Sequence, residues 1–273
     1  MKCSGVILLA FVLCVKAGAQ PDSLNGAEPW HTIVKQDVGT FWSAFLHIGS
    51  APARWNGKSA AIAGEMIVTT GVTGLADEQV ALRAQRSRSR SADHIESVVR
   101  MYGEVWVLAA ACGGSYAVGL ISGDRWLHET AFLAGTGLIL TATATQAVKF
   151  IAGRSRPYLS DGPGAFRMFA GDEDHHSFPS GHTAAAFSVS AVLAHQFRNA
   201  WATAGLYTLA TLTSLSRVYA DEHWFSDCVF SAMLSTAITH SLLRWYDERG
   251  APTSEGGVRV VPTVGGITVL YIF

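Results

Sequence analysis

Long runs without charged side chains dominate the middle of this chain of 273 residues. Such runs, of about 15 to 19 residues, suit α-helices. Ala, Gly, Ser and Thr are frequent in them, and small residues let helices pack closely. The uncharged runs are Val105–Gly123, Thr130–Val148, Thr183–Phe197, Asn199–Ser216 and Cys228–Leu243, and Ser59–Leu75 is a further run rich in apolar and small residues. The pattern predicts an all-α helical bundle of about six core helices.

The N-terminal segment has the three parts of an export signal. Lys2 supplies a positive charge, Val6–Val15 is apolar, and Ala17-Gly18-Ala19 is a small-residue cleavage site. The apolar run is shorter than the ~20 residues that a membrane-spanning helix needs. We therefore expect residues 1–19 to be a signal peptide, with an uncleaved N-terminal anchor as the alternative.

The remaining segments differ in character. Residues 20–58 contain several Pro and Gly and are expected to form an irregular arm with short helices, ahead of a helical domain over 59–250. The tail, 251–273, is β-rich: Val258–Val261 and Ile267–Phe273 predict a short C-terminal β-hairpin. An arginine-rich stretch over 76–100 suggests a solvated helix and loop, or a patch for anionic headgroups.

Composition narrows the choice of environment and partners. Only 15% of the residues are charged, so the bundle is either heavily buried or partly in lipid. Of the 20 basic residues, Lys2 and Lys16 lie in the signal, so 18 face 21 acidic residues in the remainder. That balance gives no indication of a nucleic-acid partner. Cleavage of residues 1–19 would also remove Cys3 and Cys14 and leave Cys112 and Cys228. These two are expected to be small buried residues, or to form a disulfide in an oxidising compartment.

Three short motifs combine charged and catalytic residue types. In chain order they are Lys149 with Arg156-Pro157, then Pro179-Ser180-Gly181-His182, then Ser216-Arg217 with His223 and Asp227. Each stands at one end of an expected helix. Short connections make consecutive helices antiparallel, so all three motifs are expected at the same end of the bundle.

These residue types suit a phosphate group. Lys149, Arg156 and Arg217 supply three positive charges, and Arg binds phosphate oxygens through two parallel hydrogen bonds. Ser180 and Gly181 open a helix, where free backbone N–H groups and the helix dipole favour an anion.

Two histidines and a carboxylate add reactive groups. His223 and Asp227 are four residues apart, which places them on one face if both lie in a helix. Asp227 would then take the Nδ1 proton of His223 and leave Nε2 free to attack phosphorus. His182 is the expected general acid for the leaving oxygen.

The three motifs, complete and in order over Lys149–Asp227, resemble the type 2 phosphatidic acid phosphatase family. This family shares its fold with bacterial class A acid phosphatases and vanadium haloperoxidases. The resemblance implies a bundle with the active site at one end, and a phosphatase that needs no metal or other cofactor and forms a phosphohistidine. It makes His223 the nucleophile, Asp227 its orienter and His182 the acid. It assigns phosphate binding to Lys149, Arg156, Ser180, Gly181 and Arg217.

Other functions stay open at this point. A vanadate-dependent haloperoxidase would use the same pocket, although the chain is short for that group. A non-catalytic lipid-binding helical protein would not need every catalytic position filled. The segment Asp172–His176 has metal-binding residue types, yet its place in the long loop Tyr158–Phe178 favours a solvated lid.

The cellular location depends on how many helices cross a membrane. If all six cross it, the pocket faces the cytoplasm, which agrees with a cytoplasmic Arg83–Arg100. Bacterial members of the family mostly act outside the cytoplasm, so we expect an exported bundle, periplasmic or membrane-associated, with its site outside. Lipid phosphates, isoprenoid diphosphates and soluble monoesters all fit as substrates, with a lipid phosphate preferred. The oligomeric state is undefined.

Overall fold

The chain folds mainly into helices, in a computed structural model that describes residues 29–250, 257–263 and 266–272. The helices are α2 (Trp30–Gly49), α3 (Gly57–Gly74), α4 (Asp77–Arg86), α5 (Arg90–Val99), α6 (Val105–Ser122), α7 (Arg125–Ala152), α8 (Gly181–Phe197), α9 (Ala200–Tyr219) and α10 (Phe225–Gly250). Short 3-10 helices are η1 (Ala51–Arg54), η2 (Arg100–Gly103), η3 (Pro157–Leu159) and η4 (Glu173–His175). The predicted signal peptide, residues 1–19, lies outside the described residues and stays a prediction.

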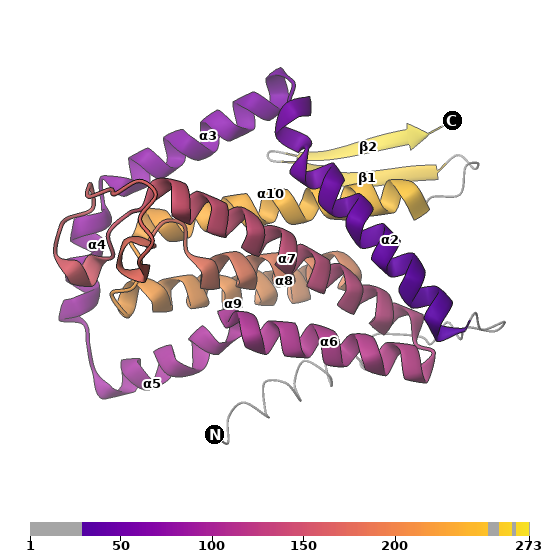
Figure 1. Ribbon diagram of the computed structural model, residues 1–273, viewed down its shortest axis with the longest axis horizontal. Helices are drawn as coiled ribbons and strands as arrows, with labels where there is room; N and C mark the ends of the chain where they lie inside the picture. Colours follow the sequence, from indigo (N-terminus) through magenta and orange to yellow (C-terminus); the bar gives the residue numbers. More distant parts are fainter. Residues whose placement is uncertain (1–28, 251–256, 264–265, 273) are drawn as a thin grey trace.

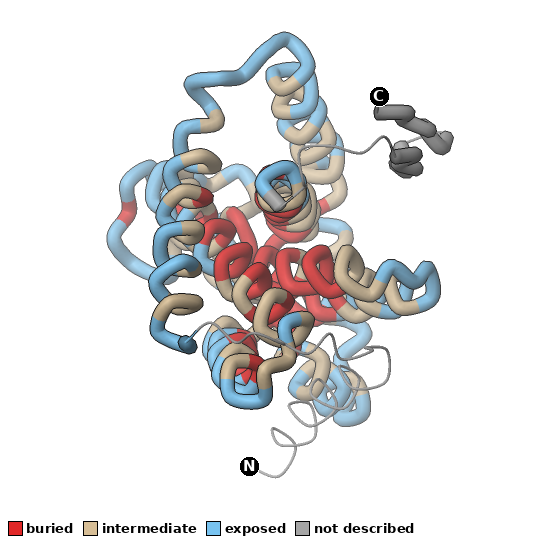
Figure 2. Tube along the Cα trace, turned by 90° about the vertical axis from the view of Figure 1, so that its right-hand side faces the viewer, coloured by how far each residue is buried: buried red, intermediate tan, exposed pale blue. Residues whose placement is uncertain are grey.

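Helix α8 lies at the centre of the bundle. It packs against α7, α9 and α10, and α6 packs against α7 (Figure 1). Ala186, Val189 and Val192 on α8 have no exposed surface, and Figure 2 shows the buried residues gathered at this centre. Small side chains let the neighbouring helices approach α8 from several sides. The predicted all-α helical bundle is confirmed.

The segment expected to be an irregular arm is largely one helix. α2 runs from Trp30 to Gly49, and its Ala44 is buried in a cluster with Leu242 and Trp245. Pro29 precedes the helix and Pro52 follows it. Because a proline at either boundary leaves the hydrogen bonds inside a helix intact, these prolines delimit α2 rather than interrupt it.

Ser59–Leu75 was expected to be a core helix. The helix is present, but it does not belong to the core. α3 forms over Gly57–Gly74, but none of its residues is buried. Ile67, Val68 and Val72 are each more than 60% exposed, and the helix runs along the edge of the bundle (Figure 1). Apolar composition alone does not distinguish a core helix from one whose apolar side chains face outward.

Two helices, α6 and α7, are long and apolar enough to cross a membrane. A third candidate is the pair α3 and α4, which is bent by 52° at its break. These assignments rest on length and composition among the described residues.

In the tail, β1 (Gly257–Thr263) and β2 (Gly266–Ile272) are antiparallel, with Val260 opposite Val269. Residues 264–265, which would form the turn between them, lie outside the described part of the chain. The predicted hairpin therefore stays a prediction.

Candidate active site

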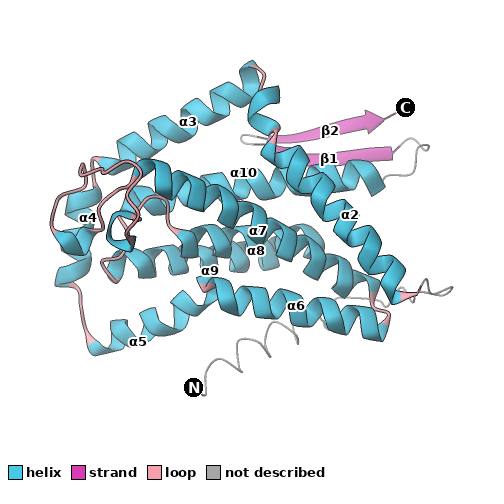
Figure 3. Cartoon of the chain, in the orientation of Figure 1, coloured by secondary structure: helices cyan, strands magenta, loops and turns pink. Residues whose placement is uncertain are grey.

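Four chain segments meet at one end of the bundle. They are the end of α7, the start of α8, the end of α9 and the residues just before α10. Figure 3 shows the long loop between α7 and α8 at this same end. The convergence of the three motifs follows from the antiparallel order of the helices, as the sequence predicts.

His223 lies two residues before α10 and is buried, with 3% of its surface exposed. Its Nδ1 atom is 2.6 Å from the carbonyl oxygen of Ser177. A carbonyl oxygen only accepts hydrogen bonds, so Nδ1 is the donor and carries the proton. The other ring nitrogen, Nε2, is then unprotonated in the neutral ring and keeps its lone pair.

The expectation that Asp227 takes the Nδ1 proton is wrong in this geometry. Oδ2 of Asp227 is 3.8 Å from Nδ1 of His223, which is too far for a hydrogen bond. The reason is that α10 begins at Phe225. His223 thus precedes the helix, and the two residues do not share a helical face.

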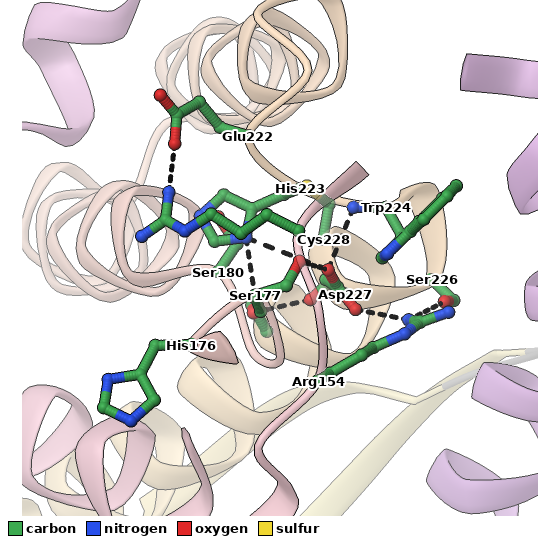
Figure 4. Close-up of polar contacts among 12 residues, drawn as sticks. Arg154, His176, Ser177, Ser180, Glu222, His223, Trp224, Ser226, Asp227 and Cys228 are labelled. Atoms are coloured by element: carbon green, nitrogen blue, oxygen red, sulfur yellow. Dashed lines mark hydrogen bonds and ion pairs between the residues drawn. The ribbon is translucent and has the colours of Figure 1, made fainter. Parts of the chain in front are cut away.

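Asp227 is nevertheless fixed beside His223 by its other contacts. Its Oδ2 accepts hydrogen bonds from Oγ of Ser177 at 2.5 Å and from the backbone N–H of Trp224 at 2.9 Å. Its Oδ1 accepts from Nη1 of Arg154 at 2.5 Å. Figure 4 shows Asp227 between His223 and Arg154. Burial raises the pKa of Asp227, but interaction with His223 and the charge of Arg154 outweigh it, and the net pKa is lowered.

The pKa of His223 is also lowered. Burial is the main cause, and the positive charges of Lys149 and Arg156 add to it, while Asp227 opposes them. Desolvation and nearby cations both disfavour an imidazolium ion. His223 is therefore neutral at pH 7, the state that leaves Nε2 able to act as a nucleophile.

Two of the expected phosphate-binding cations have protein partners. Nζ of Lys149 donates to the carbonyl oxygen of His176. Nη1 of Arg156 donates to the carboxylate of Glu222, and Nε donates to the carbonyl oxygen of Glu173 at 2.9 Å. Glu222 thus occupies part of the guanidinium edge that a phosphate oxygen would use.

Arg217 is buried and only partly satisfied. Its Nη1 donates to Oε1 of Glu96 at 2.9 Å. Its Nε is buried and has no hydrogen-bond partner among the residues that the structure describes. An unsatisfied buried N–H is unfavourable, and a bound anion would supply the missing acceptor.

His182 has a carboxylate partner that the sequence analysis missed. Nε2 of His182 is 3.2 Å from Oε2 of Glu104. The net pKa of His182 is lowered: burial is the largest cause and the charge of Arg217 adds to it, while Glu104 opposes both. Glu104 therefore supports the protonated form that a general acid requires.

Ser180 and Gly181 form the N-terminus of α8. The hydroxyl oxygen of Ser180 accepts from the backbone N–H of Thr183 and caps the helix. A Cβ atom at Gly181 would meet nothing within 4 Å, so open space adjoins the backbone here. An anion in this space would lie at the positive end of the helix dipole.

Five charged residues around the motifs were absent from the predicted set. They are Asp77, Glu96, Glu104, Arg154 and Glu222. Glu222 adjoins His223, and Arg154 lies two positions before Arg156, so motif proximity could have found both. The other three come from segments far away in the sequence, where nothing local signals the contact.

Cys112 and Cys228 are both buried and free, in agreement with small buried residues and not with a disulfide. In the segment Asp172–His176, Nδ1 of His175 is 2.5 Å from Oδ1 of Asp172, and Nε2 of His176 is 2.9 Å from the carbonyl oxygen of Ala170. Among the described residues, no three His, Cys, Asp or Glu side chains group as metal ligands do.

Comparison with known proteins points to one family. Residues 130–251 match the family model of the PAP2 superfamily. A lipid A 1-phosphatase from Porphyromonas gingivalis is 33% identical over 104 residues, which cover 37% of this chain and 20% of that protein. The match thus spans about a fifth of the length of this curated relative.

Two solved structures were also found to be similar to this chain. Aquifex aeolicus LpxE superposes with a TM-score of 0.50 at 21% identity, over 62% of this chain and 94% of that one. A transmembrane PAP2 type phosphatidylglycerolphosphate phosphatase from Bacillus subtilis gives a TM-score of 0.48 at 17% identity, over 80% and 98%. The likeness to LpxE concerns the fold alone. The residues that match the PAP2 family model, 130–251, run from within α7 to the end of α10 and contain all three motifs. This part of the chain is therefore similar to the PAP2 superfamily.

Proposed function

We propose that this protein is a metal-independent phosphatase that hydrolyses a phosphate monoester or diphosphate through a phosphohistidine on His223. The observation that carries the proposal is the hydrogen bond from Nδ1 of His223 to the carbonyl oxygen of Ser177, 2.6 Å long. It leaves Nε2 as the reactive nitrogen in a pocket surrounded by cations.

In the first step, Nε2 of His223 attacks phosphorus and the bond from phosphorus to the leaving oxygen breaks. His182 gives its proton to that oxygen, so a monoester releases an alcohol and a diphosphate releases a monophosphate. Lys149, Arg156 and Arg217 neutralise charge on the three remaining phosphoryl oxygens, together with the open N-terminus of α8. Fixed positive groups of this kind are the main source of rate in phosphoryl transfer.

In the second step, water attacks the phosphohistidine. His182, now neutral, accepts a proton from the water, the bond between phosphorus and Nε2 breaks, and inorganic phosphate is released. The enzyme returns to its starting protonation state. His182 thus acts as acid and then as base, and Asp227 keeps a negative charge close to the ring while the nitrogen gains positive charge.

A lipid phosphate is the substrate class that we favour. The curated relative is described as a lipid A 1-phosphatase, and α6 and α7 are apolar enough to cross a membrane. Membrane association would bring the pocket to lipid headgroups. We further propose that the protein is exported and that its pocket works outside the cytoplasm, on the basis of the N-terminal sequence.

Purified protein should be assayed for phosphate release from a lipid phosphate, an isoprenoid diphosphate and a soluble monoester, with and without EDTA. We expect turnover that EDTA leaves unchanged, highest on one of the two lipid substrates. H223A should lose at least about a thousandfold in kcat, because removal of a nucleophile usually costs more than that. Bromide oxidation with vanadate and peroxide, without phosphate release, would instead indicate a haloperoxidase. Lipid binding without turnover would indicate a non-catalytic protein.

A further inference from the structure

Beyond the expected motif residues, a buried polar network lies behind the nucleophile. We propose that Arg154 and Asp77 are positioning residues: they hold Asp227 and the first turn of α10 in place, so that His223 stays aimed at the substrate. This inference rests on the proposed function of His223.

Arg154 is the centre of the network. It follows α7 in the loop that leads to Arg156, and only 5% of it is exposed. Nη1 donates to Oδ1 of Asp227 at 2.5 Å and to Oγ of Ser226 at 2.9 Å. Nη2 donates to Oδ2 of Asp77 at 2.7 Å, and Nε donates to the carbonyl oxygen of Pro163 at 2.9 Å. All three guanidinium nitrogens are thus engaged inside the protein.

Asp77 joins a distant helix to the start of α10. It lies in the first turn of α4 and is completely buried. Its Oδ1 accepts from the backbone N–H of Ser226 at 2.8 Å, and its Oδ2 accepts from the Ser226 hydroxyl at 2.6 Å. The first backbone N–H groups of a helix have no partner inside the helix. Asp77 therefore caps α10 from 149 positions earlier in the sequence.

The network ends at the nucleophile. Arg154 contacts Asp227, Asp227 accepts from the Ser177 hydroxyl, and the Ser177 carbonyl oxygen accepts from Nδ1 of His223. Figure 4 shows Arg154 on the side of Asp227 that faces away from His223. Arg154 thus acts through Asp227 and not directly on substrate.

Charge explains why the two residues belong together. Two fully buried carboxylates, Asp77 and Asp227, share the single guanidinium of Arg154. A buried charge is tolerated only when it is paired and hydrogen-bonded. Arg suits this role because its planar fork can serve two carboxylates at once, whereas the ammonium of Lys is a single point charge.

The first test measures kcat and KM of D77N, R154Q, R154K and the D77N/R154Q double variant. Matched controls are E78Q and R167Q, exposed neighbours in the same helix turn and the same loop. We expect kcat of D77N and R154Q to fall about ten- to hundredfold, the usual effect of removing a supporting residue. KM and the inhibition constant of vanadate should stay within about threefold, because the phosphate-binding residues are intact. R154K should lie between wild type and R154Q, and the double variant should be no worse than R154Q.

The second test does not depend on turnover. ¹⁵N-histidine NMR, with the His223 signal assigned from H223A, should show wild type with its proton on Nδ1. D77N and R154Q should show a mixture of the two tautomers, and E78Q and R167Q should match wild type. If R154Q fails to fold, the His223 tautomer is compared in D77N and R154K instead.

Unchanged kcat and an unchanged His223 tautomer in D77N and R154Q would overturn the inference. The inference would also be overturned if the whole loss of kcat/KM came from a higher KM, with a matching rise in the inhibition constant of vanadate. Arg154 would then be a phosphate-binding residue. A wild-type protein that holds the Nδ1 tautomer but releases no phosphate from any substrate would contradict the proposed function instead.

Discussion

At the scale of single residues, the proposed acid and the proposed nucleophile have different partners. His223 is oriented by a backbone carbonyl, which cannot change its charge, whereas His182 faces the carboxylate of Glu104. In the proposed mechanism, the proton that His182 gives to the leaving oxygen is therefore stabilised by the nearby negative charge of Glu104.

Replacement of His182 by Ala should depend on the leaving group. A general acid commonly contributes about a hundred- to ten-thousandfold, but little when the departing oxygen is already stable as an anion. The loss in kcat should be much smaller on nitrophenyl phosphate than on an alkyl phosphate. An equal loss on both substrates would assign His182 a different role.

Replacement of Glu104 by Gln should move the alkaline limb of the pH profile for kcat on an alkyl phosphate. Glu104 raises the pKa of His182 against the opposing effects of burial and Arg217. Without that charge the pKa falls, so His182 loses its proton at lower pH and activity declines earlier as the pH rises. E65Q, an exposed position on α3, is the control. A limb that stays in place or moves to higher pH would contradict the assignment.

Replacement of Glu222 by Gln should strengthen phosphate binding. Glu222 pairs with Arg156 and competes with a phosphate oxygen for the same guanidinium. Because this pair is partly exposed, its contribution is about 0.2–1 kcal/mol, and the inhibition constant of phosphate should fall by up to about fivefold. E173Q, at an 85% exposed side chain 3.6 Å from Arg156, should have a smaller effect. A weaker affinity for phosphate in E222Q would contradict the competition.

At the scale of elements, the close docking of the 153–170 loop on the end of α7 depends on a glycine. Gly153 ends α7 with φ of +58°, and a Cβ there would lie 1.6 Å from the carbonyl oxygen of Arg167. G153A should therefore destabilise the protein by more than the ~1 kcal/mol of a left-handed alanine and lower kcat, since Lys149 and Arg154 flank it. G171A meets nothing within 4 Å and should leave the melting temperature unchanged. Equal melting temperatures for both variants would contradict this account of the loop.

The helices that carry the motifs could be predicted from the sequence because runs without charge mark them directly. Antiparallel order then places Lys149, His182 and His223 at one end without any knowledge of contacts. Partners such as Asp77 and Glu104 could not be predicted, because a contact between distant helices leaves no local pattern. The expected hydrogen bond between Asp227 and His223 failed for a smaller reason: the first turn of α10 begins two residues later than the spacing suggested.

At the scale of the whole molecule, apolar surface favours a bundle in contact with lipid. Trp106 and Ile121, near the two ends of α6, are 81% and 87% exposed, and α3 exposes its apolar side chains at the edge of the bundle. Large exposed apolar surfaces on a protein usually contact another protein or a membrane. A lipid environment would account for helices whose outward residues are as apolar as their inward ones.

Cell fractionation should therefore find the protein in the membrane pellet after a carbonate wash. If residues 1–19 are a cleaved signal peptide, the first residue of the mature chain should be Gln20. An alkaline phosphatase reporter fused after Phe273 should be active, because that reporter works only outside the cytoplasm. Retention of Met1 together with an active cytoplasmic reporter at Phe273 would contradict both export and the outward-facing pocket.

The most direct test of the central claim is to trap the covalent intermediate. Enzyme mixed with ³²P-labelled substrate and quenched in alkali within one turnover should carry label that is stable to base and released by acid, as a phosphohistidine is. Peptide mapping should place the label on His223, and H223A should carry none. Rapid turnover by wild type with no trapped label, or label on a residue other than His223, would contradict the account.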